Sequence, residues 1–472
     1  MVNEQCLLER LGVGVQSFDL AVIGAGAGGL NSALTAVSAG KRVVLIERHK
    51  PGGECTWAGC IPSKALIQIA KDVKVAQKYA SIAIDGAAIM RKVRALIEEA
   101  HQAEAVPTLQ DAGIEYRHGT ARLIDNTTLD VDGQAIYADR IVIATGSSPV
   151  VPGIPGLQSV PYLTNETIFQ LESLPESLII LGAGAIGVEL SQAFQRLGVK
   201  VKLVDQAETV LPREEPEFAG AVQDMLSKEG VGIYVGRTVK SVRQEGADIV
   251  LSFAAGDSIE EIRGHSLLLA LGRKPNTDTI NLSDVGVEYD AKGIKVDDFC
   301  ETTTPGIYAV GDVVGPYLFS HTGGYQAREL VRNLYSSDSP KPISLDGVAW
   351  CTFTEPELAH CGLSEEEARG VYGDEITVFT GKYSDLDRAV VDQKTVGMGK
   401  VVCDKHGHIL GASILGERAC ELLGELQVMK QHGIPLQGLQ SAIHPYPGYS
   451  ELLLYLSFDA YAYFGASSDE NN

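Results

Sequence analysis

Two stretches of the chain repeat one pattern of apolar and polar positions. In each, a short apolar run meets a glycine-rich turn, a helix-like segment follows, and a second apolar run ends on an acid. The first copy starts with FDLAVI (18–23) and ends at Glu47, and the second starts with SLIIL (177–181) and ends at Asp205. Short, nearly continuous apolar runs are typical of buried parallel strands. The copies stand 158 residues apart, too far for a solenoid, so they predict two α/β units of one kind.

Both turns have the spacing of a dinucleotide-binding motif, GxGxxG. Glycines at these places let the backbone approach a pyrophosphate at a helix N-terminus, and the acid holds a ribose hydroxyl. Glycine-rich turns are frequent in other proteins, but here the complete strand–turn–helix–strand–acid context is present. The sequence therefore predicts two nucleotide sites. Their glycines are Gly24, Gly26 and Gly29 in the first copy, and Gly182, Gly184 and Gly187 in the second.

The second site is expected to prefer NADH to NADPH. Asp205 suits the free 2′-hydroxyl of NAD and would repel the 2′-phosphate of NADP. A 2′-phosphate usually attracts arginine, and the next residues, 206–208, contain none.

Weaker patterns predict the elements around these two units. Residues 64–112 look helical, with a break near 81–86, and 114–136 alternate in the way of short antiparallel strands. Residues 149–161 hold four prolines and two glycines and look like an interdomain linker. Three further buried strands run into tight turns, at 138–148, 266–277 and 305–315.

After about residue 336 the composition changes and no further phosphate turn appears. The patterns there suggest an antiparallel sheet with helices, which is a third, α+β domain. Residues 441–465 are dense in Leu, Tyr and Phe, which would suit a subunit interface.

Candidate redox chemistry lies directly after the first nucleotide unit, in GGECTWAGCIPSK (52–64). Cys55 and Cys60 stand near the start of a predicted helix, where a pair at this spacing can close as a disulfide. The helix N-terminus would favour a thiolate on one sulfur after reduction. Two buried free cysteines are the alternative. Position beside a nucleotide unit favours the redox pair.

Composition narrows the class of protein. The 472 residues are too many for one core, and 45% apolar with 21% charged residues is an ordinary globular balance. A net charge of −22 argues against nucleic acid or an anionic membrane as partner. No apolar run is long enough to span a membrane, and the first seventeen residues do not resemble a secretory signal.

Cysteine usage points to a reducing compartment such as the cytoplasm. Eight cysteines are too sparse for a disulfide scaffold, so one active pair is expected. The other six are expected to be structural thiols: Cys6, Cys300, Cys351, Cys361, Cys403 and Cys420.

The order of these motifs, with Cys-x4-Cys-Ile-Pro-Ser-Lys, ATGSSP and LGRKPNT between and after the glycine turns, resembles the class I pyridine nucleotide-disulfide oxidoreductases. Dihydrolipoamide dehydrogenase, glutathione reductase and mercuric reductase belong to that family. The resemblance covers about residues 18–460 and implies an α/β fold with two Rossmann-like domains, for FAD and NAD, before a C-terminal α+β dimerisation domain. It implies a first FAD part at 1–152, an NAD domain at 153–274, a second FAD part at 275–340 and a dimerisation domain at 341–472.

The resemblance also implies cofactors and roles. Glu47 would hold the FAD adenosine, and Asp312 the ribityl chain, although a turn aspartate is the usual reading of Gly-Asp. Other cofactor contacts are expected at both sets of turn glycines and at Gly53, Lys64, Ala144, Thr145, Gly146, Glu189, Asp205, Gly272, Arg273 and Gly311.

In the implied reaction, electrons pass from the nicotinamide through the flavin to Cys60, and Cys55 meets a small dithiol or disulfide. Lys64, one helical turn after Cys60, would stabilise the reduced flavin and pair with Glu189. The enzyme would be a homodimer whose sites are completed by the neighbouring C-terminal domain.

One place departs from the dehydrogenase branch, where that domain supplies a histidine and, five residues later, a glutamate as acid and base. If Glu451 is aligned with that glutamate, Tyr446 occupies the histidine position and His444 falls two residues early. Tyrosine is a poor thiol base at neutral pH. His444 would either replace the base or simply be packed.

Three functions therefore stay open. The first is an NADH-dependent flavoenzyme acting on a small dithiol or disulfide, similar to dihydrolipoamide dehydrogenase. The second is a mercuric-reductase-like reductase of a soft metal ion or a quinone, and the third is a redox sensor or complex subunit with little turnover.

Overall fold

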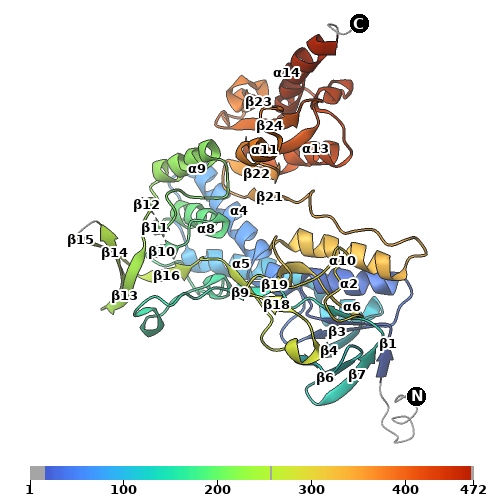
Figure 1. The fold of residues 1–472 in the computed structure, drawn as a ribbon. Helices are drawn as coiled ribbons and strands as arrows, with labels where there is room; N and C mark the ends of the chain where they lie inside the picture. Colours follow the sequence, from blue (N-terminus) through green and yellow to red (C-terminus); the bar gives the residue numbers. More distant parts are fainter. Residues whose placement is uncertain (1–15, 256–257, 469–472) are drawn as a thin grey trace, which may run out of the picture.

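A computed structural model of the protein describes residues 16–255 and 258–468; Cys6 lies outside these ranges. The chain forms three sheet-containing units: the second is inserted into the first, and the third lies at one end of the molecule (Figure 1). The first two are α/β units around parallel sheets and the third is α+β. The predicted fold class is therefore confirmed.

The first unit is built on a parallel sheet of five strands in the order β20-β8-β2-β3-β4. Its central strands carry the apolar runs of the sequence and are buried on both faces, as parallel strands covered by helices must be. The predicted strand 18–23 is divided by a bend into two strands. The bounds are β1 Gln16–Phe18, β2 Leu20–Ile23, β3 Val43–Glu47, β4 Glu115–His118, β8 Ile141–Ile143 and β20 Ile307–Ala309.

One strand contradicts the prediction for 114–136. Glu115–His118 pairs in parallel with β3 at the edge of the large sheet, because helices α5 and α6 return the chain to that edge. The antiparallel pattern applies only to the rest, which forms a second sheet in the order β1-β7-β6-β5. Its strands are β5 Ala121–Leu123, β6 Thr128–Val131 and β7 Gln134–Ala138.

Helices α2 (Ala27–Ser38) and α10 (Ser320–Tyr335) pack side by side on the first sheet (Figure 1). The predicted helical region with a break is confirmed. It contains α3 Gly53–Trp57, α4 Cys60–Ala76, α5 Gly86–His101 and α6 Val106–Asp111.

The second unit repeats the first on a smaller scale. Its parallel sheet has the order β12-β11-β10-β16, with α8 (Ala185–Arg196) after the glycine turn and α9 (Pro216–Lys228) further on. A three-stranded antiparallel sheet projects beside it (Figure 1). The strands are β10 Ser177–Leu181, β11 Lys200–Val204, β12 Gly232–Tyr234, β13 Val239–Glu245, β14 Asp248–Ala255, β15 Ser258–Gly264 and β16 Ser266–Leu269.

The chain passes from the first unit to the second and later returns, and the two segments that make these crossings pair with each other. Strand β9 (Ser147–Pro149) runs antiparallel to β17 (Arg273–Pro275). The segment expected to be a linker therefore begins inside a short strand pair, which fixes both crossings at one place.

The third unit has five antiparallel strands in the order β21-β22-β25-β24-β23, as the sequence predicts. It is tied to the second unit by ion pairs, among them Lys400–Glu215 at 2.5 Å and Arg196–Glu355. The bounds are β21 Ala349–Thr352, β22 Glu357–Gly362, β23 Ile376–Lys382, β24 Met398–Asp404, β25 Ile409–Gly416, α11 Glu365–Tyr372, α13 Ala419–Gln431 and α14 Glu451–Ser468.

Apolar packing also joins the three units. One cluster of buried side chains runs from α4 through α8 and β10 to Leu358 and Leu415 of the third unit. Within residues 16–255 and 258–468, no helix combines the length and the apolar character that crossing a bilayer requires.

Candidate active site

The two glycine turns have the same internal geometry. A Cβ on Gly24 would lie 2.4 Å from the Ala144 carbonyl oxygen, and one on Gly29 would lie 1.8 Å from the Gly24 carbonyl oxygen. The corresponding distances in the second turn are 2.2 Å for Gly182, to the Ala270 carbonyl oxygen, and 1.9 Å for Gly187, to the Gly182 carbonyl oxygen. The first and third glycines of each turn are therefore required by the protein's own backbone.

The middle glycines face open space instead. A Cβ on Gly26 would have only the Gly53 Cα near it, at 3.8 Å, and one on Gly184 would have nothing within 4 Å. Both have negative φ values that other residues also adopt. Nothing in residues 16–255 and 258–468 explains these two glycines, and a pyrophosphate lying against the backbone would explain both.

The two acids are held in matching ways. A Glu47 carboxylate oxygen accepts from the Ala25 N–H at 2.8 Å, and an Asp205 oxygen accepts from the Ala183 N–H at 2.5 Å. In both cases 22 residues separate donor and acceptor. Each carboxylate has lone pairs left for ribose hydroxyls. The donor and acceptor groups at both turns thus fit a dinucleotide.

Other predicted cofactor residues follow the neighbouring strands. The turns after β2, β8 and β20 meet at one edge of the first sheet, and they carry Gly24, Ala144-Thr145-Gly146 and Gly311-Asp312. Crevices at the carboxyl ends of parallel strands are where open α/β sheets bind ligands. Asp312 accepts a hydrogen bond from the Ser147 hydroxyl at 2.5 Å, so it is tied to the turn after β8. This edge fits FAD.

Arg273, predicted as a cofactor contact, is held by protein groups. Its guanidinium donates to both Glu54 carboxylate oxygens and, at 2.9 Å, to the Ser147 carbonyl oxygen. Burial lowers the pKa of Arg273, with Asp312 opposing that effect. All of these partners belong to the first unit. Arg273 therefore ties the segment that returns from the second unit to the first unit. Gly272 accepts from the Val150 N–H at 3.0 Å in the same strand pair.

The cysteine segment lies against the first glycine turn. A Cβ on Gly53 would meet the Gly26 Cα at 2.6 Å, and the Gly52 N–H donates to the Ala25 carbonyl oxygen at 2.9 Å. Cys55 lies in α3, and Cys60 is the first residue of α4. Close glycine packing therefore brings both sulfurs beside the predicted FAD edge.

The two thiols hydrogen-bond to one another and differ in acidity. The bond from Cys55, helped by the Ser320 hydroxyl 3.6 Å away and the Lys64 ammonium, lowers the pKa of Cys60 to about 6. The same bond and burial raise the pKa of Cys55. In the reduced pair, Cys60 is the thiolate and Cys55 the thiol at neutral pH.

Lys64 and Glu189 form an ion pair of 2.7 Å between α4 and α8. The other Glu189 oxygen accepts from the Phe353 N–H at 2.9 Å, and the Lys64 ammonium lies 4.5 Å from the centre of the Phe353 ring. The third unit thus helps to fix a cation beside the cysteine pair.

Three predicted residues have all their recorded partners in the third unit. His444 is largely buried, with its Nε2 3.0 Å from Glu425 and its Nδ1 3.3 Å from the Ala442 carbonyl oxygen. The Tyr446 hydroxyl donates to Asp387 at 2.7 Å, a bond that raises its pKa. Glu451 accepts from the Gly448 N–H at 3.3 Å. None of these contacts reaches the cysteine segment of the same chain.

Sequence reasoning missed several residues that shape the site, namely Glu54, Ser147, Asn276, Ser320 and Phe353. Asn276 donates to the Thr145 carbonyl oxygen at 2.9 Å and accepts from the Ser148 hydroxyl at 2.7 Å. Ser147, Ser148 and Asn276 stand inside quoted motifs, so their positions were a signal. Ser320 and Phe353 lie in no motif, and only the fold brings them to the cysteines.

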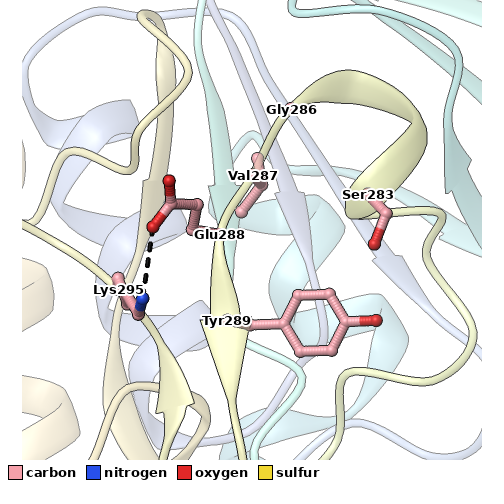
Figure 2. A pocket seen from close by; sticks show the side chains of 6 residues that line it. All are labelled: Ser283, Gly286, Val287, Glu288, Tyr289 and Lys295. Carbon is pink, nitrogen blue, oxygen red and sulfur yellow. Dashed lines mark hydrogen bonds and ion pairs between the residues drawn. The ribbon is translucent and has the colours of Figure 1, made fainter.

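A hollow of about 630 Å³ lies elsewhere on the first unit, beside the hairpin of β18 (Tyr289–Asp290) and β19 (Gly293–Ile294) (Figure 2). Its lining has one ion pair, Lys295–Glu288 at 3.2 Å, and Tyr289 points away from that pair. No residue of either glycine turn or of the cysteine segment lines it.

Comparisons with known proteins agree with this geometry. The chain is 32% identical over 470 residues to a mercuric reductase of Lysinibacillus sphaericus, covering 97% of this chain and 86% of that protein. It is 31% identical to a dihydrolipoyl dehydrogenase of Chlorobaculum tepidum, covering 94% and 97%. The solved Cu(II) complex of the HOCl-induced flavoprotein disulfide reductase RclA from Escherichia coli matches with a TM-score of 0.83 and 28% identity, over 94% of this chain and 99% of that one.

Family models cover most of the sequence. The model for pyridine nucleotide-disulphide oxidoreductases matches residues 18–335, and the model for the dimerisation domain of these enzymes matches residues 348–455. Two nucleotide turns, a cysteine pair beside the first of them and a dimerisation domain are the parts that such an enzyme needs. The chain belongs to the pyridine nucleotide-disulfide oxidoreductases, and it is an FAD-dependent enzyme that uses NAD(P).

Proposed function

We propose that the protein is an NADH-dependent reductase that delivers electrons to a small disulfide through Cys55 and Cys60. One observation carries this proposal: the two thiols hydrogen-bond to one another, with the thiolate on Cys60 at the N-terminus of α4. FAD, when bound, supplies the two-electron link between a nicotinamide and a disulfide. The protein's own groups bind it, exclude water and hold charge.

Each sulfur has a separate task in this proposal. Cys60 keeps its negative charge beside the Lys64 ammonium and the Ser320 hydroxyl, on the side of the first glycine turn. Cys55 keeps its proton until it meets a substrate sulfur. Lys64 balances charge there, because Glu189 holds its ammonium in place. A dithiol that works in this way suits a reducing compartment such as the cytoplasm.

The preference for NADH rests on the end of β11. Asp205 lies there with Glu208, which is so close to Gly236 that a Cβ on that glycine would meet its carboxylate at 2.8 Å. Arg237 donates its backbone N–H to the Asp205 carbonyl oxygen at 2.9 Å, while its side chain pairs with Glu260 at 3.6 Å. Two carboxylates and an arginine engaged elsewhere disfavour a 2′-phosphate.

The residues at the expected acid–base positions favour a second candidate function, the reduction of a soft metal ion. Both His444 nitrogens have partners, and Tyr446 is a hydrogen-bond donor with a raised pKa, so neither is a ready base for a thiol. A soft metal ion needs no such base, because binding it lowers the pKa of the thiols themselves. The relative from Lysinibacillus sphaericus is a mercuric reductase, and RclA was solved with Cu(II).

A turnover panel separates these candidates. The holoprotein is given NADH or NADPH with lipoamide, glutathione disulfide, mercuric ion, Cu(II) or a quinone, as the native chain, Tyr446→His and Tyr446→Phe. We expect NADH to exceed NADPH in kcat/KM by on the order of tenfold or more. Tyr446→His should raise disulfide turnover by on the order of tenfold, since a base is restored in the neighbouring chain's third domain. Tyr446→Phe should not raise it.

Four results would count against the proposal. Faster turnover with NADPH would remove the argument from Asp205. Unchanged turnover in Cys55→Ser or Cys60→Ser would remove the dithiol. Rapid reduction of mercuric ion with negligible disulfide turnover in all three variants would favour the metal ion as substrate, and negligible turnover with every acceptor would favour a sensor.

A further inference from the structure

A second pair of cysteines meets in the third unit. Cys351 on β21 and Cys420 in the first turn of α13 are far apart in sequence, yet β21 and α13 pack against each other, and each thiol is the strongest influence on the acidity of the other. Both are free and partly accessible. They were expected to be structural thiols, and this pairing sets them apart from the others.

The remaining described cysteines outside the active-site segment behave as structural thiols. Cys300, Cys361 and Cys403 are buried in apolar clusters. Burial raises their pKa values to about 12, 11 and 12. Thiols of this kind react slowly, because the thiolate is the reactive form.

The surroundings of the pair divide its two sulfurs into different roles. The bond from Cys351 lowers the pKa of Cys420, with a further contribution from Lys64, and Cys420 also lies at the positive end of α13. The same bond and burial raise the pKa of Cys351. Cys420 is thus the nucleophilic sulfur and Cys351 the one that resolves. The backbone N–H of Cys420 donates to Glu357 at 3.3 Å, which fixes the start of the helix.

The pair is also close to the active-site cation. Cys351 stands two residues before Phe353, whose N–H holds Glu189 and whose ring lies under the Lys64 ammonium. Glu189 is among the charges that raise the pKa of Cys351, and Lys64 is among those that lower the pKa of Cys420. The Lys64–Glu189 ion pair therefore has one dithiol, Cys55 and Cys60, on the first unit and another on the third.

We propose that Cys351 and Cys420 are a second redox-active dithiol, which closes to a disulfide between β21 and α13 when the protein meets a two-electron oxidant such as hydrogen peroxide. The Cys420 thiolate attacks one peroxide oxygen, the O–O bond breaks, and hydroxide leaves a sulfenic acid on Cys420. The Cys351 sulfur then attacks Cys420, the S–O bond breaks, and the departing hydroxide takes the Cys351 proton. Two thiols are oxidised and one peroxide becomes two waters. This inference is independent of the substrate proposed above.

Peptide mapping of the wild-type holoenzyme tests the proposal. The protein is reduced with dithiothreitol, desalted, exposed to hydrogen peroxide without NADH, blocked with N-ethylmaleimide and digested with trypsin. We expect one cross-linked species that joins Cys351 to Cys420 and disappears on renewed reduction. Cys361 shares a tryptic peptide with Cys351, so fragment ions must assign the sulfur. The Cys55–Cys60 bridge lies in another peptide and does not interfere.

Variants assign the two roles. Cys351→Ser should leave a sulfenic acid on Cys420 that dimedone traps, and Cys420→Ser should leave Cys351 alkylatable after the same exposure. Cys403→Ala removes a buried thiol whose acidity is shifted by burial and Asp404 and by no other thiol of the described residues, and it should leave the cross-link intact. The proposal is wrong if wild-type Cys420 passes to sulfonic acid without a cross-link, or if the bond joins two chains, which non-reducing electrophoresis would reveal.

Discussion

At the scale of single residues, Cys60 differs from Cys55 through its position in the fold. Cys60 begins α4, so it lies at the positive end of a helix of seventeen residues, whereas Cys55 is inside the short helix before it. The Ser320 hydroxyl lies 3.6 Å from the Cys60 sulfur, and the Lys64 ammonium further favours the Cys60 thiolate. The pair is thereby divided into one charged and one neutral sulfur.

The acidity of Cys60 gives the first prediction. Cys60 is an acid with a depressed pKa of about 6, so the reduced protein carries the thiol below that pH and the thiolate above it. Alkylation by iodoacetamide should rise about tenfold per pH unit up to pH 6 and level off above pH 7. Ser320→Ala should move the midpoint upward by about half a unit, since one partner of the thiolate is lost. A midpoint near the ordinary cysteine value would contradict this account.

The second prediction concerns the Lys64–Glu189 pair. Lys64→Met leaves the carboxylate of Glu189, which is only 5% exposed, without its cation. We expect a loss of about 1–2 kcal/mol in the free energy of unfolding, because the lysine itself is partly in water. The pKa of Cys60 should also rise, since Lys64 helps to lower it.

Lys71→Met is the matched control for that change. Lys71 lies on the same helix and pairs with Glu357 at 3.8 Å, but it is not among the groups that shift Cys60. Urea titration and iodoacetamide kinetics should show both effects in Lys64→Met and no change of the Cys60 midpoint in Lys71→Met. Equal midpoints in both variants would remove Lys64 from the site.

At the scale of elements, the glycine turns explain which glycines the protein needs for itself. Gly187 must be glycine because a Cβ would overlap the Gly182 carbonyl oxygen. Gly184 has no such neighbour, and its φ of −74° suits any residue. Gly187 is therefore needed for folding, whereas Gly184 is expected to be needed only for nucleotide binding.

Substitution of these two glycines is the third prediction. Gly184→Ala should leave the melting temperature within about a degree and weaken NADH binding by on the order of tenfold or more, because the added methyl points into the space of a pyrophosphate. Gly187→Ala should destabilise or prevent folding of the second unit. Calorimetry and NADH titration distinguish the two. Normal NADH affinity in Gly184→Ala would mean that the nucleotide lies elsewhere.

The elements most readable from sequence were those with a local signal. The spacing of Gly24, Gly26 and Gly29 and the apolar run before them fixed strand, turn and helix together, because each depends on neighbouring residues only. The prediction of an antiparallel strand at Glu115–His118 was wrong. The alternation of its residues does not reveal that the preceding helices bring it to the edge of the parallel sheet, beside β3.

Contacts between segments far apart in the sequence could not be predicted from local patterns. Ser320 meets Cys60 across 260 residues, and the Phe353 N–H meets Glu189 across 164. No pattern within either segment encodes the other, so only the assembled fold reveals them. The motif positions of Lys64 and Glu189 were predicted through family resemblance, and the backbone group that holds Glu189 in place was not.

At the scale of the whole molecule, α14 presents a row of aromatic side chains to solvent. Phe458 is 50% exposed and Tyr461 is 59% exposed. These two residues and Tyr455 follow one another at intervals of three, so all three lie on one face of the helix. A dimerisation domain with such a face is suited to covering it with a second chain.

The fourth prediction tests that face. The double change Phe458→Lys with Tyr461→Lys should weaken the dimer by on the order of tenfold or more, because two aromatic anchors become charges. Tyr79→Lys is the control, since Tyr79 is 86% exposed beyond the end of α4 on the first unit. Sedimentation velocity over a range of concentrations gives the answer. A dimer as tight as the wild type would place the contact on another surface.

The strand order of the first sheet has a consequence for synthesis on the ribosome. Strand β8 keeps one edge unpaired until β20 arrives, about 160 residues later in the chain. At roughly 5–20 residues per second, that delay is on the order of ten seconds or more. The second unit emerges complete within this interval and is free to fold first. The nascent polypeptide therefore finishes its earliest domain only after the second, and until then an open strand edge is exposed that a chaperone could cover.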